Sequence, residues 1–420
     1  MSHKEHLGID YLARVEGETA VSVDLDGAPS IELRIFEPPR FFEGFLVGRK
    51  FDEAGDIVSR ICGICPVSHM STAIQAVERA MGIEVSVQTR LLRKIMTVSQ
   101  ICASHLLHLY MLAMPDYYGL NGIPDMISGR QKGQVGRLMR MKELMNDITG
   151  LIGGRALHPV THLPGGFTRM PEKEEFVPLL ERLKTAKEDA RDVVSDIARL
   201  EVPQFRSGTE YVALDAPDEY AISGGRIRST RGLDISVEEY EDNFQESQVR
   251  HAFAKQTRVR GRSSIMVGAL ARLNIKYDKL GEETKSLARK MSFTVPCDNP
   301  FMNNLAQALE IFDGAASLIG SIGAYRGDEG PASPVTVRPG EGCAITEAPR
   351  GLLYYRYKID RKGVIQESDI VTPTSHNSLN LEKDLLKLVD ENRGKGRDTI
   401  RQLCEKLVRA YDPCFSCSVH

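Results

Sequence analysis

Helical periodicity dominates the hydrophobic pattern of this chain. Apolar residues recur at three- and four-residue spacing through a series of long segments, which predicts amphipathic helices. We expect these helices at residues 67–114 with a break near Gly82, 124–152, 172–200, 236–256, 275–291, 299–322, 379–392 and 397–410. Helices of this length favour a bundle that buries its apolar faces in a shared core.

Strand patterns are confined to shorter stretches. Residues 18–36 alternate polar and apolar side chains around Asp26-Gly27, a pair that favours a tight hairpin turn. Residues 203–235 and 335–375 are expected to form short strands with turns and loops. We therefore predict a mainly α fold with small β elements, of the α+β class, in which a bundle of long helices forms the core.

Composition narrows the class of protein without selecting a function. The chain is 42% hydrophobic and 26% charged, which is ordinary globular composition, and residues 1–420 are expected to form a single domain. A formal net charge of -3 gives no reason to expect a nucleic-acid partner. The N-terminus lacks the apolar core of a secretory signal, and the apolar stretch 101–114 is too short to span a bilayer. We expect a cytoplasmic protein with no membrane span.

The cysteines supply the first sign of chemistry. Four of the eight form two Cys-x-x-Cys pairs, Cys62 with Cys65 and Cys414 with Cys417. In a cytoplasmic protein, clustered cysteines indicate metal or redox chemistry. Four thiolates are a soft ligand set that suits zinc, iron–sulfur clusters, copper(I) or nickel. The pairs lie near opposite ends of the chain, whereas zinc sites usually bring them closer, so spacing alone leaves both zinc and redox-active metals open.

The segments around both pairs match a known family. The first pair lies in Arg60-x-Cys62-x-x-Cys65-x-x-x-His69 and the second in Asp412-Pro413-Cys414-x-x-Cys417-x-x-His420. Further matching segments are Arg14-Val-Glu16-Gly17, Pro39-Arg-Phe-Phe-Glu43, Ser104-His105-Leu-Leu-His108-Leu-Tyr110, Gly154-Arg155-Ala-Leu-His158-Pro159, Glu347-Ala-Pro349-Arg350-Gly351 and Val371-Thr372-Pro373-Thr374. Over nearly its whole length the sequence resembles the large, catalytic subunits of nickel–iron hydrogenases. The resemblance implies the hydrogenase large-subunit fold and the reversible cleavage of dihydrogen into protons and electrons.

The resemblance also implies a nickel–iron centre held by the four cysteines. Cys62 and Cys414 would be terminal nickel ligands, while Cys65 and Cys417 would bridge nickel to an iron that also carries carbon monoxide and cyanide. His69 would donate a hydrogen bond to a cysteine sulfur and so tune its charge. Without the resemblance, His69 would be a histidine on the surface of a helix.

Heterolytic cleavage of dihydrogen needs an acceptor for the hydride and a nearby base for the proton. The resemblance makes Cys414 that base and Glu16 the first proton acceptor beyond it. Arg350, next to Pro349, would lie beside the open substrate position and stabilise charge or take part in proton transfer. Thr374 would donate a hydrogen bond to a cyanide. Without the resemblance, Glu16 would be an ion-pair partner and Arg350 a surface residue in a turn.

A magnesium ion is a further implication of the resemblance. Glu43, the backbone carbonyl of Ile370 and the ring of His420 match the positions that bind it, and hard oxygen ligands suit this ion. In that family, a maturation endopeptidase removes an extension after the final histidine. The chain ends at His420, so we expect its mature form.

The route taken by the electrons lies outside the motifs of this chain. The sequence shows no further cysteine cluster, no Rossmann glycine fingerprint and no P-loop. Iron–sulfur clusters and flavin are therefore expected only in partner subunits. These partners are an iron–sulfur hydrogenase small subunit and flavin- and NAD(P)-binding subunits. Ser104 stands where membrane-linked branches have an aspartate, so the sequence most resembles the soluble NAD(P)-coupled and sulfhydrogenase-like branch.

Other functions remain open at this point. A hydrogenase subunit of this kind could instead feed a heterodisulfide reductase or a deazaflavin-reducing complex. A non-enzyme alternative is a metal-free scaffold related to the quinone-site subunit of respiratory NADH dehydrogenase, which has lost the metal-binding cysteines. A structural zinc protein is the third possibility, and metal analysis would separate the three.

Overall fold

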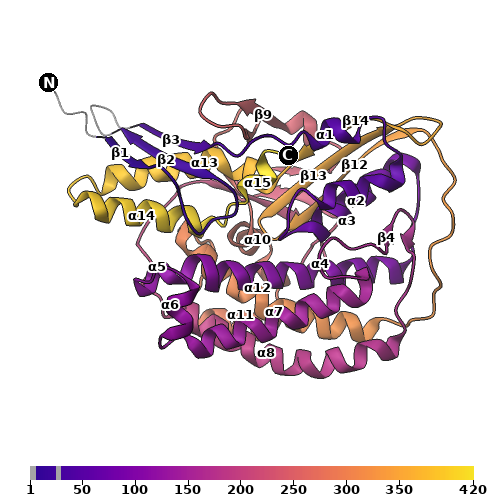
Figure 1. Ribbon diagram of the computed structural model, residues 1–420, viewed down its shortest axis with the longest axis horizontal. Helices are drawn as coiled ribbons and strands as arrows, with labels where there is room; N and C mark the ends of the chain where they lie inside the picture. The colour runs from indigo at the N-terminus through magenta and orange to yellow at the C-terminus, as the bar shows by residue number, and fades with distance from the viewer. Residues whose placement is uncertain (1–5, 25–29) are drawn as a thin grey trace.

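A layer of long helices forms one side of the molecule in the computed structural model, which describes residues 6–24 and 30–420 (Figure 1). These helices run roughly parallel to one another and are α4 (Val87–Leu107), α7 (Lys132–Gly153), α8 (Val177–Ala198) and α12 (Asn303–Ala324). Pairs of them bury their apolar faces against each other, with α4 in contact with both α7 and α12. The predicted bundle of long helices is confirmed.

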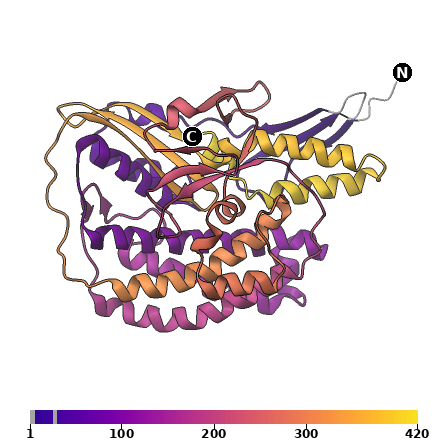
Figure 2. The same ribbon diagram turned by 180° about the vertical axis from the view of Figure 1, so that it is seen from behind.

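The second layer is built around an antiparallel sheet. Its strands are β12 (Gly340–Ala348), β13 (Gly351–Ile359) and β14 (Ile365–Val371). Helix α3 (Pro66–Met81) packs across β12 and β13. The chain then continues through α13 (Pro373–Glu391), α14 (Arg397–Ala410) and the short α15 (Phe415–Ser418). Seen from either side, the C-terminus lies in the middle of this layer (Figures 1 and 2).

Short elements connect and cover these layers. The remaining helices are α1 (Phe42–Leu46), α2 (Ala54–Ser59), α5 (Met114–Tyr118), α6 (Ile123–Ser128), α9 (Tyr240–Asn243), α10 (Ala269–Lys276), α11 (Glu282–Lys290), a π-helical turn at His108–Ala113 and 3-10 turns at Phe51–Glu53, Lys173–Phe176, Tyr277–Lys279 and Pro300–Met302. The remaining strands are β1 (His6–Ile9), β2 (Thr19–Asp24), β3 (Ser30–Ile35), β4 (His162–Leu163), β5 (Gly166–Phe167), β6 (Glu210–Asp215), β7 (Arg226–Ser229), β8 (Asp234–Ile235), β9 (Phe244–Gln248), β10 (Lys255–Val259) and β11 (Ile265–Met266).

The predicted N-terminal hairpin is confirmed and gains a strand. β2 pairs with β3 in antiparallel register, and β1 adds to the other edge of β2. The predicted turn at Asp26-Gly27 lies outside the described residues. The predicted break at Gly82 and the predicted helix at 397–410 are also confirmed.

The helix predicted at residues 236–256 is wrong. This segment contains only one helical turn, α9, followed by the hairpin of β9 and β10, in which Phe244 lies opposite Val259. Its acidic and polar residues favour a helix locally, but packing decides the outcome. The ring of Tyr240 stacks between Phe244 and Tyr354, with centroids 4.4 and 4.1 Å away, and the extended strand keeps Phe244 in that stack.

Two long apolar helical runs, Val87–Tyr118 and Pro300–Ala324, have the length and composition to cross a membrane. Most of their apolar windows, 78% and 72%, are buried inside the molecule. They form the inner helices of the bundle. A helix buried in a protein core can have the same length and apolar composition as a helix that crosses a membrane.

The topology carries the end of the chain back to its beginning. Glu16 and Cys414 form a parallel β-bridge, and the amide of Phe415 donates to the carbonyl of Glu16 at 2.9 Å. Gly17 permits this approach, because its φ is +88° and a Cβ there would lie 2.7 Å from the Ser416 nitrogen. The two Cys-x-x-Cys pairs are thereby placed beside each other.

Candidate metal centre

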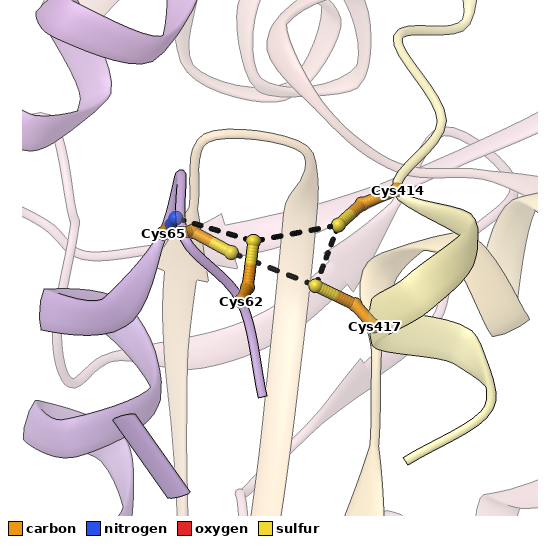
Figure 3. Close-up of side chains that lie close together, drawn as sticks. All are labelled: Cys62, Cys65, Cys414 and Cys417. Atoms are coloured by element: carbon orange, nitrogen blue, oxygen red, sulfur yellow. Dashed lines mark hydrogen bonds between the residues drawn. The ribbon is translucent and has the colours of Figure 1, made fainter. Parts of the chain in front are cut away.

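Four cysteine sulfurs converge at the junction of the two chain ends (Figure 3). The Sγ atoms of Cys62, Cys65, Cys414 and Cys417 all lie within 4.8 Å of one another, and all four residues are buried and unbridged by disulfides. Cys62 faces Cys414 at 3.6 Å, and Cys65 faces Cys417 at 3.7 Å. Each sulfur of one motif therefore faces a sulfur of the other motif. Together the four sulfurs form a cage whose members can serve as ligands of one shared metal centre.

The first pair is held by the N-terminus of α3. Cys65 immediately precedes this helix and Pro66 occupies its first turn, where the missing N–H of proline costs nothing. The amides of Ile64 and Cys65 donate to Cys62 Sγ at 3.2 and 3.4 Å. Backbone donors of this kind stabilise negative charge on the sulfur.

The second pair is held by the start of α13 and by α15. The amide of Cys414 donates to Thr374 Oγ1 at 2.9 Å, so the hydroxyl proton of Thr374 remains free to donate elsewhere. Cys417 lies on α15, one turn beyond Cys414. The two pairs thus come from segments far apart in the sequence and meet only in the folded chain.

Arg40 clamps the two cysteine loops together and was not singled out by the sequence motifs. Its guanidinium donates to the carbonyls of Ile61 at 2.8 Å and Ser416 at 2.5 Å. Its backbone amide donates to the carbonyl of Val419 at 3.0 Å. The signal available in the sequence was its place in the matching segment that contains Glu43, but only the structure shows that one side chain spans both loops.

Glu16 contacts the sulfur cage directly. The thiol of Cys414 donates to Glu16 Oε2 at 2.9 Å. Ser416 holds the same carboxylate through its amide, 3.2 Å from Oε2, and through its hydroxyl, which donates to Oε1. The carboxylate is therefore fixed beside Cys414 Sγ, and its Oε2 faces this sulfur as a proton acceptor.

Arg350 lies in the turn that links β12 to β13, and its charge interacts with the sulfurs of the cage. Its Nε donates to the carbonyl of Asp412 at 2.8 Å and to Asp412 Oδ1 at 3.1 Å. Burial opposes the charge of this guanidinium, but Asp412 and then the cysteine sulfurs outweigh it and raise the pKa of Arg350. Its terminal Nη2 forms an ion pair with Asp412 Oδ1 at 3.0 Å, whereas Nη1 is buried without a hydrogen-bond partner in the described residues and remains an open donor.

The four thiols differ in acidity. Burial raises the pKa of Cys414 and of Cys417 well above the ordinary value. Hydrogen bonds from neighbouring thiols, that of Cys414 first, lower the pKa of Cys62. A bound metal requires thiolates and displaces their protons, so occupancy of this cage couples metal binding to proton release.

His69 stands behind the cage on α3 and is fully buried. Its Nδ1 lies 2.7 Å from the hydroxyl of Tyr355 on β13, a partner that the sequence motifs did not indicate. Burial lowers the pKa of His69 to about 4, so its imidazole is neutral near neutral pH. A neutral ring carries one N–H and one acceptor nitrogen.

The residues predicted to bind magnesium also come together. His420 Nε2 lies 3.8 Å from Glu43 Oε1, while His420 Nδ1 lies 2.8 Å from the carbonyl oxygen of Cys417. The amide of Ile370 donates to Glu43 Oε1 at 2.9 Å, so Ile370 reaches Glu43 through its N–H rather than its carbonyl. Burial opposes ionisation of Glu43, but His420 and the Ile370 amide lower its pKa.

Cage chemistry and fold together fit a soft metal centre. Four buried thiols offer ligands to nickel or iron, and the unpartnered Nη1 of Arg350 offers a donor to an electron-rich ligand. Burying thiols and a guanidinium nitrogen without partners costs free energy, so an ordinary apolar core would not contain them.

Comparison with known proteins agrees with this geometry. Residues 40–125 match the family model for nickel-dependent hydrogenase. The chain is 35% identical to the sulfhydrogenase 1 subunit alpha of Pyrococcus furiosus, over 98% of this chain and 97% of that protein. It is 25% identical to the NAD-reducing hydrogenase HoxS subunit beta of Cupriavidus necator, over 100% of this chain and 95% of that protein. A solved NAD+-reducing NiFe-hydrogenase in the H2-reduced state shares the fold, with a TM-score of 0.89 at 24% identity over 99% of each chain.

The fold and the buried sulfur cage thus define a nickel-dependent hydrogenase, and the chain belongs to that family. Its place within the family is that of the catalytic large subunit of a nickel–iron hydrogenase, an oxidoreductase that acts on dihydrogen. The family and the α+β fold inferred from the cysteine motifs and helical pattern are confirmed. The structural zinc protein and the metal-free scaffold are both set aside.

Proposed function

We propose that this subunit cleaves dihydrogen at a nickel–iron centre and that the electrons pass through an iron–sulfur partner subunit to NAD(P). The observation that carries the proposal is the convergence of four buried sulfurs, one of which is hydrogen-bonded to the Glu16 carboxylate, with the buried Arg350 guanidinium close enough to interact with their charge. Cys62 and Cys414 are the proposed terminal nickel ligands, and Cys65 and Cys417 the proposed bridges to iron. The metal centre supplies the electron-pair acceptor that dihydrogen cleavage requires.

The proton has a defined path out of the site. Cys414 Sγ takes it at the cage and passes it to Glu16 Oε2, 2.9 Å away. The Ser416 amide and hydroxyl keep the carboxylate oriented during the transfer. A base positioned by hydrogen bonds in this way contributes about a hundredfold to ten-thousandfold in rate.

Two donors serve the proposed diatomic ligands of iron, carbon monoxide and cyanide. Thr374 Oγ1 accepts from the Cys414 amide, which leaves its proton for a cyanide. One terminal nitrogen of Arg350 is paired with Asp412 Oδ1 at 3.0 Å, and the other, Nη1, has no partner in the described residues and is proposed to face the cyanide and the substrate position. If the Tyr355 hydroxyl donates to His69 Nδ1, then Nε2 carries the ring proton and is the nitrogen that donates to a cysteine sulfur.

Replacing Arg350 by lysine is expected to lower kcat for hydrogen oxidation about 100-fold, because lysine loses the planar fork that reaches past Asp412. Nickel content should not change, since Arg350 is not a ligand. The measurement is dye-linked hydrogen oxidation by the purified complex, normalised to nickel. Arg326→Lys, at an exposed site 3.0 Å from Asp328, is the matched control and should keep wild-type kcat. A near-normal kcat in Arg350→Lys would remove Arg350 from the mechanism.

Magnesium is proposed between Glu43, Ile370 and His420. Glu43 has a lowered pKa and His420 Nε2 lies on its open side, which suits a divalent cation. Binding there would lock the final residues against α1. This fits a maturation endopeptidase that acts after His420 before the site closes.

Electrons are proposed to leave through the loop between Cys62 and Cys65. Gly63 in this loop is exposed, and a cavity of about 230 Å³ opens beside it. Leu157, which is 49% exposed, lines the same cavity and gives the surface an apolar contact. A partner that places an iron–sulfur cluster against this loop would lie next to the segment that carries Cys62 and Cys65.

The assembled complex tests the electron acceptor. We expect the chain, co-purified from cytoplasm with an iron–sulfur small subunit and flavin- and NAD(P)-binding subunits, to reduce NADP or NAD with dihydrogen. The similarity to the sulfhydrogenase and NAD-reducing hydrogenase subunits supports this choice. Hydrogen-dependent reduction of a deazaflavin or a heterodisulfide, with no reduction of NADP or NAD, would overturn the NAD(P) assignment in favour of the alternative acceptors.

A further inference from the structure

A second cluster of buried charges lies beneath the turn that carries Arg350. It consists of Arg272 and Lys276 on α10, Glu310 on α12 and Glu347 on β12. Their exposed fractions are 0%, 0%, 5% and 0%. Two positive and two negative side chains form a balanced set, and none of them touches the cysteine sulfurs in the contacts that the described residues make.

Arg272 is the centre of this cluster. Its Nε and one terminal nitrogen donate to the two oxygens of Glu310, both at 2.6 Å. The other terminal nitrogen donates to Glu347 Oε2 at 3.0 Å. Glu310 is itself fixed, because it also accepts from His105 Nε2 at 2.8 Å and from the hydroxyl of Tyr220.

The remaining donations of Arg272 go to the backbone of the Arg350 turn. Its terminal nitrogens donate to the carbonyl of Ala348 at 3.1 Å and to the carbonyl of Pro349 at 3.0 Å. These are the two peptide units that immediately precede Arg350. The guanidinium of Arg272 therefore holds the backbone of the turn through two hydrogen bonds, while the side chain of Arg350 extends from the same turn.

The turn that carries Arg350 is a two-residue hairpin connection. Ala348 pairs with Gly351 across the hairpin, so Pro349 and Arg350 alone make the connection. Gly351 has a φ of +127°, and a Cβ there would lie 2.4 Å from Val267 Cγ2. The backbone is thus pressed against Val267 on one face and held by Arg272 through its carbonyls.

Stability does not explain such a cluster. Buried ion pairs lose so much solvation that well-packed apolar residues of the same volume are usually as stable or more so. What apolar residues cannot do is donate to two successive carbonyls. Planar recognition by five fixed N–H groups is specific to arginine.

We propose that Arg272, held rigid by Glu310, is a positioning residue that fixes the Pro349–Arg350 turn and so aims the Arg350 guanidinium at the metal centre. The inference rests on the proposed role of Arg350. It predicts that loss of the Arg272 fork misplaces Arg350 while the cysteine cage stays intact.

The test uses Arg272→Lys in the intact complex, because lysine keeps the charge but cannot hold Glu310 and both carbonyls together. We expect nickel content to stay at the wild-type level, KM for dihydrogen to stay within twofold, and kcat to fall at least tenfold. A crystal structure of the variant should show the Arg350 guanidinium displaced and the four sulfurs in place. Glu310→Gln, which keeps the shape but weakens the hold on Arg272, should give a smaller fall in kcat of the same kind.

Arg93→Lys is the matched control. Arg93 is also buried, 6% exposed, and makes a two-pronged pair with Glu78 at 2.7 and 2.6 Å, with no contact to the cage among the described residues. It should lose a comparable amount of thermal stability and keep kcat. Wild-type kcat in Arg272→Lys, or an equal loss in Arg93→Lys, would overturn the positioning role. If Arg272→Lys does not assemble, an unchanged kcat in Glu310→Gln overturns it. The proposed function fails separately, if the wild-type complex lacks nickel or does not oxidise dihydrogen.

Discussion

Cys414→Ala is expected to abolish hydrogen oxidation and to remove nickel from the purified chain. Cys414 lies at the meeting point of the cage, 3.6 Å from Cys62 and 2.9 Å from the Glu16 carboxylate. The substitution therefore removes a proposed metal ligand and the first proton acceptor together. Losing two functions that act as one unit should lower activity by more than about ten-thousandfold, to the background of the assay. Dye-linked hydrogen oxidation and metal analysis of the same preparation provide the measurement.

Cys404→Ala is the control for this experiment. Cys404 is also a buried free thiol, on α14, but it lies outside the cage. Its removal should leave nickel content and activity near the wild-type level. A fully active Cys414→Ala variant would show that the ligand set is wrong.

Glu16→Gln is expected to slow exchange between dihydrogen and solvent deuterons by about a thousandfold, because an amide cannot take the proton from Cys414. Glutamine keeps the shape and its oxygen can still accept from Ser416, so nickel content should stay unchanged. The measurement is mass-spectrometric isotope exchange at constant nickel. Glu18→Gln, two residues away on the exposed surface, should exchange at the wild-type rate. Near-normal exchange in Glu16→Gln would refute the relay through Glu16.

Much of the helical architecture could be predicted because its signals are local. The break at Gly82 and the limits of α14 follow from glycine and from apolar spacing, which act within a few residues. The same reasoning predicted a helix at residues 236–256, and this prediction was wrong. Its outcome depends on stacking of Tyr240 against Tyr354, a residue more than a hundred positions away, and no local pattern carries that contact.

The candidate site divides in the same way. Two Cys-x-x-Cys motifs name the ligands, and the resemblance names Glu16 and Arg350. The residues that hold those groups in place could not be predicted, since each acts across a long separation in sequence. Arg40 reaches Ser416, and Arg272 reaches Pro349, through backbone carbonyls that every residue type carries. Because every residue has a backbone carbonyl, the sequence does not indicate which carbonyl accepts a hydrogen bond. These contacts of Arg40 and Arg272 can be seen only in the folded structure.

The central claim is that one nickel–iron pair lies inside the cage of four sulfurs. Anomalous diffraction from crystals of the purified complex, recorded at the nickel and iron absorption edges, tests it most directly. We expect one nickel peak within bonding distance of Cys62, Cys65, Cys414 and Cys417, with one iron peak beside Cys65 and Cys417. A cage that contains zinc alone, or a nickel peak bound elsewhere on the chain, would contradict it.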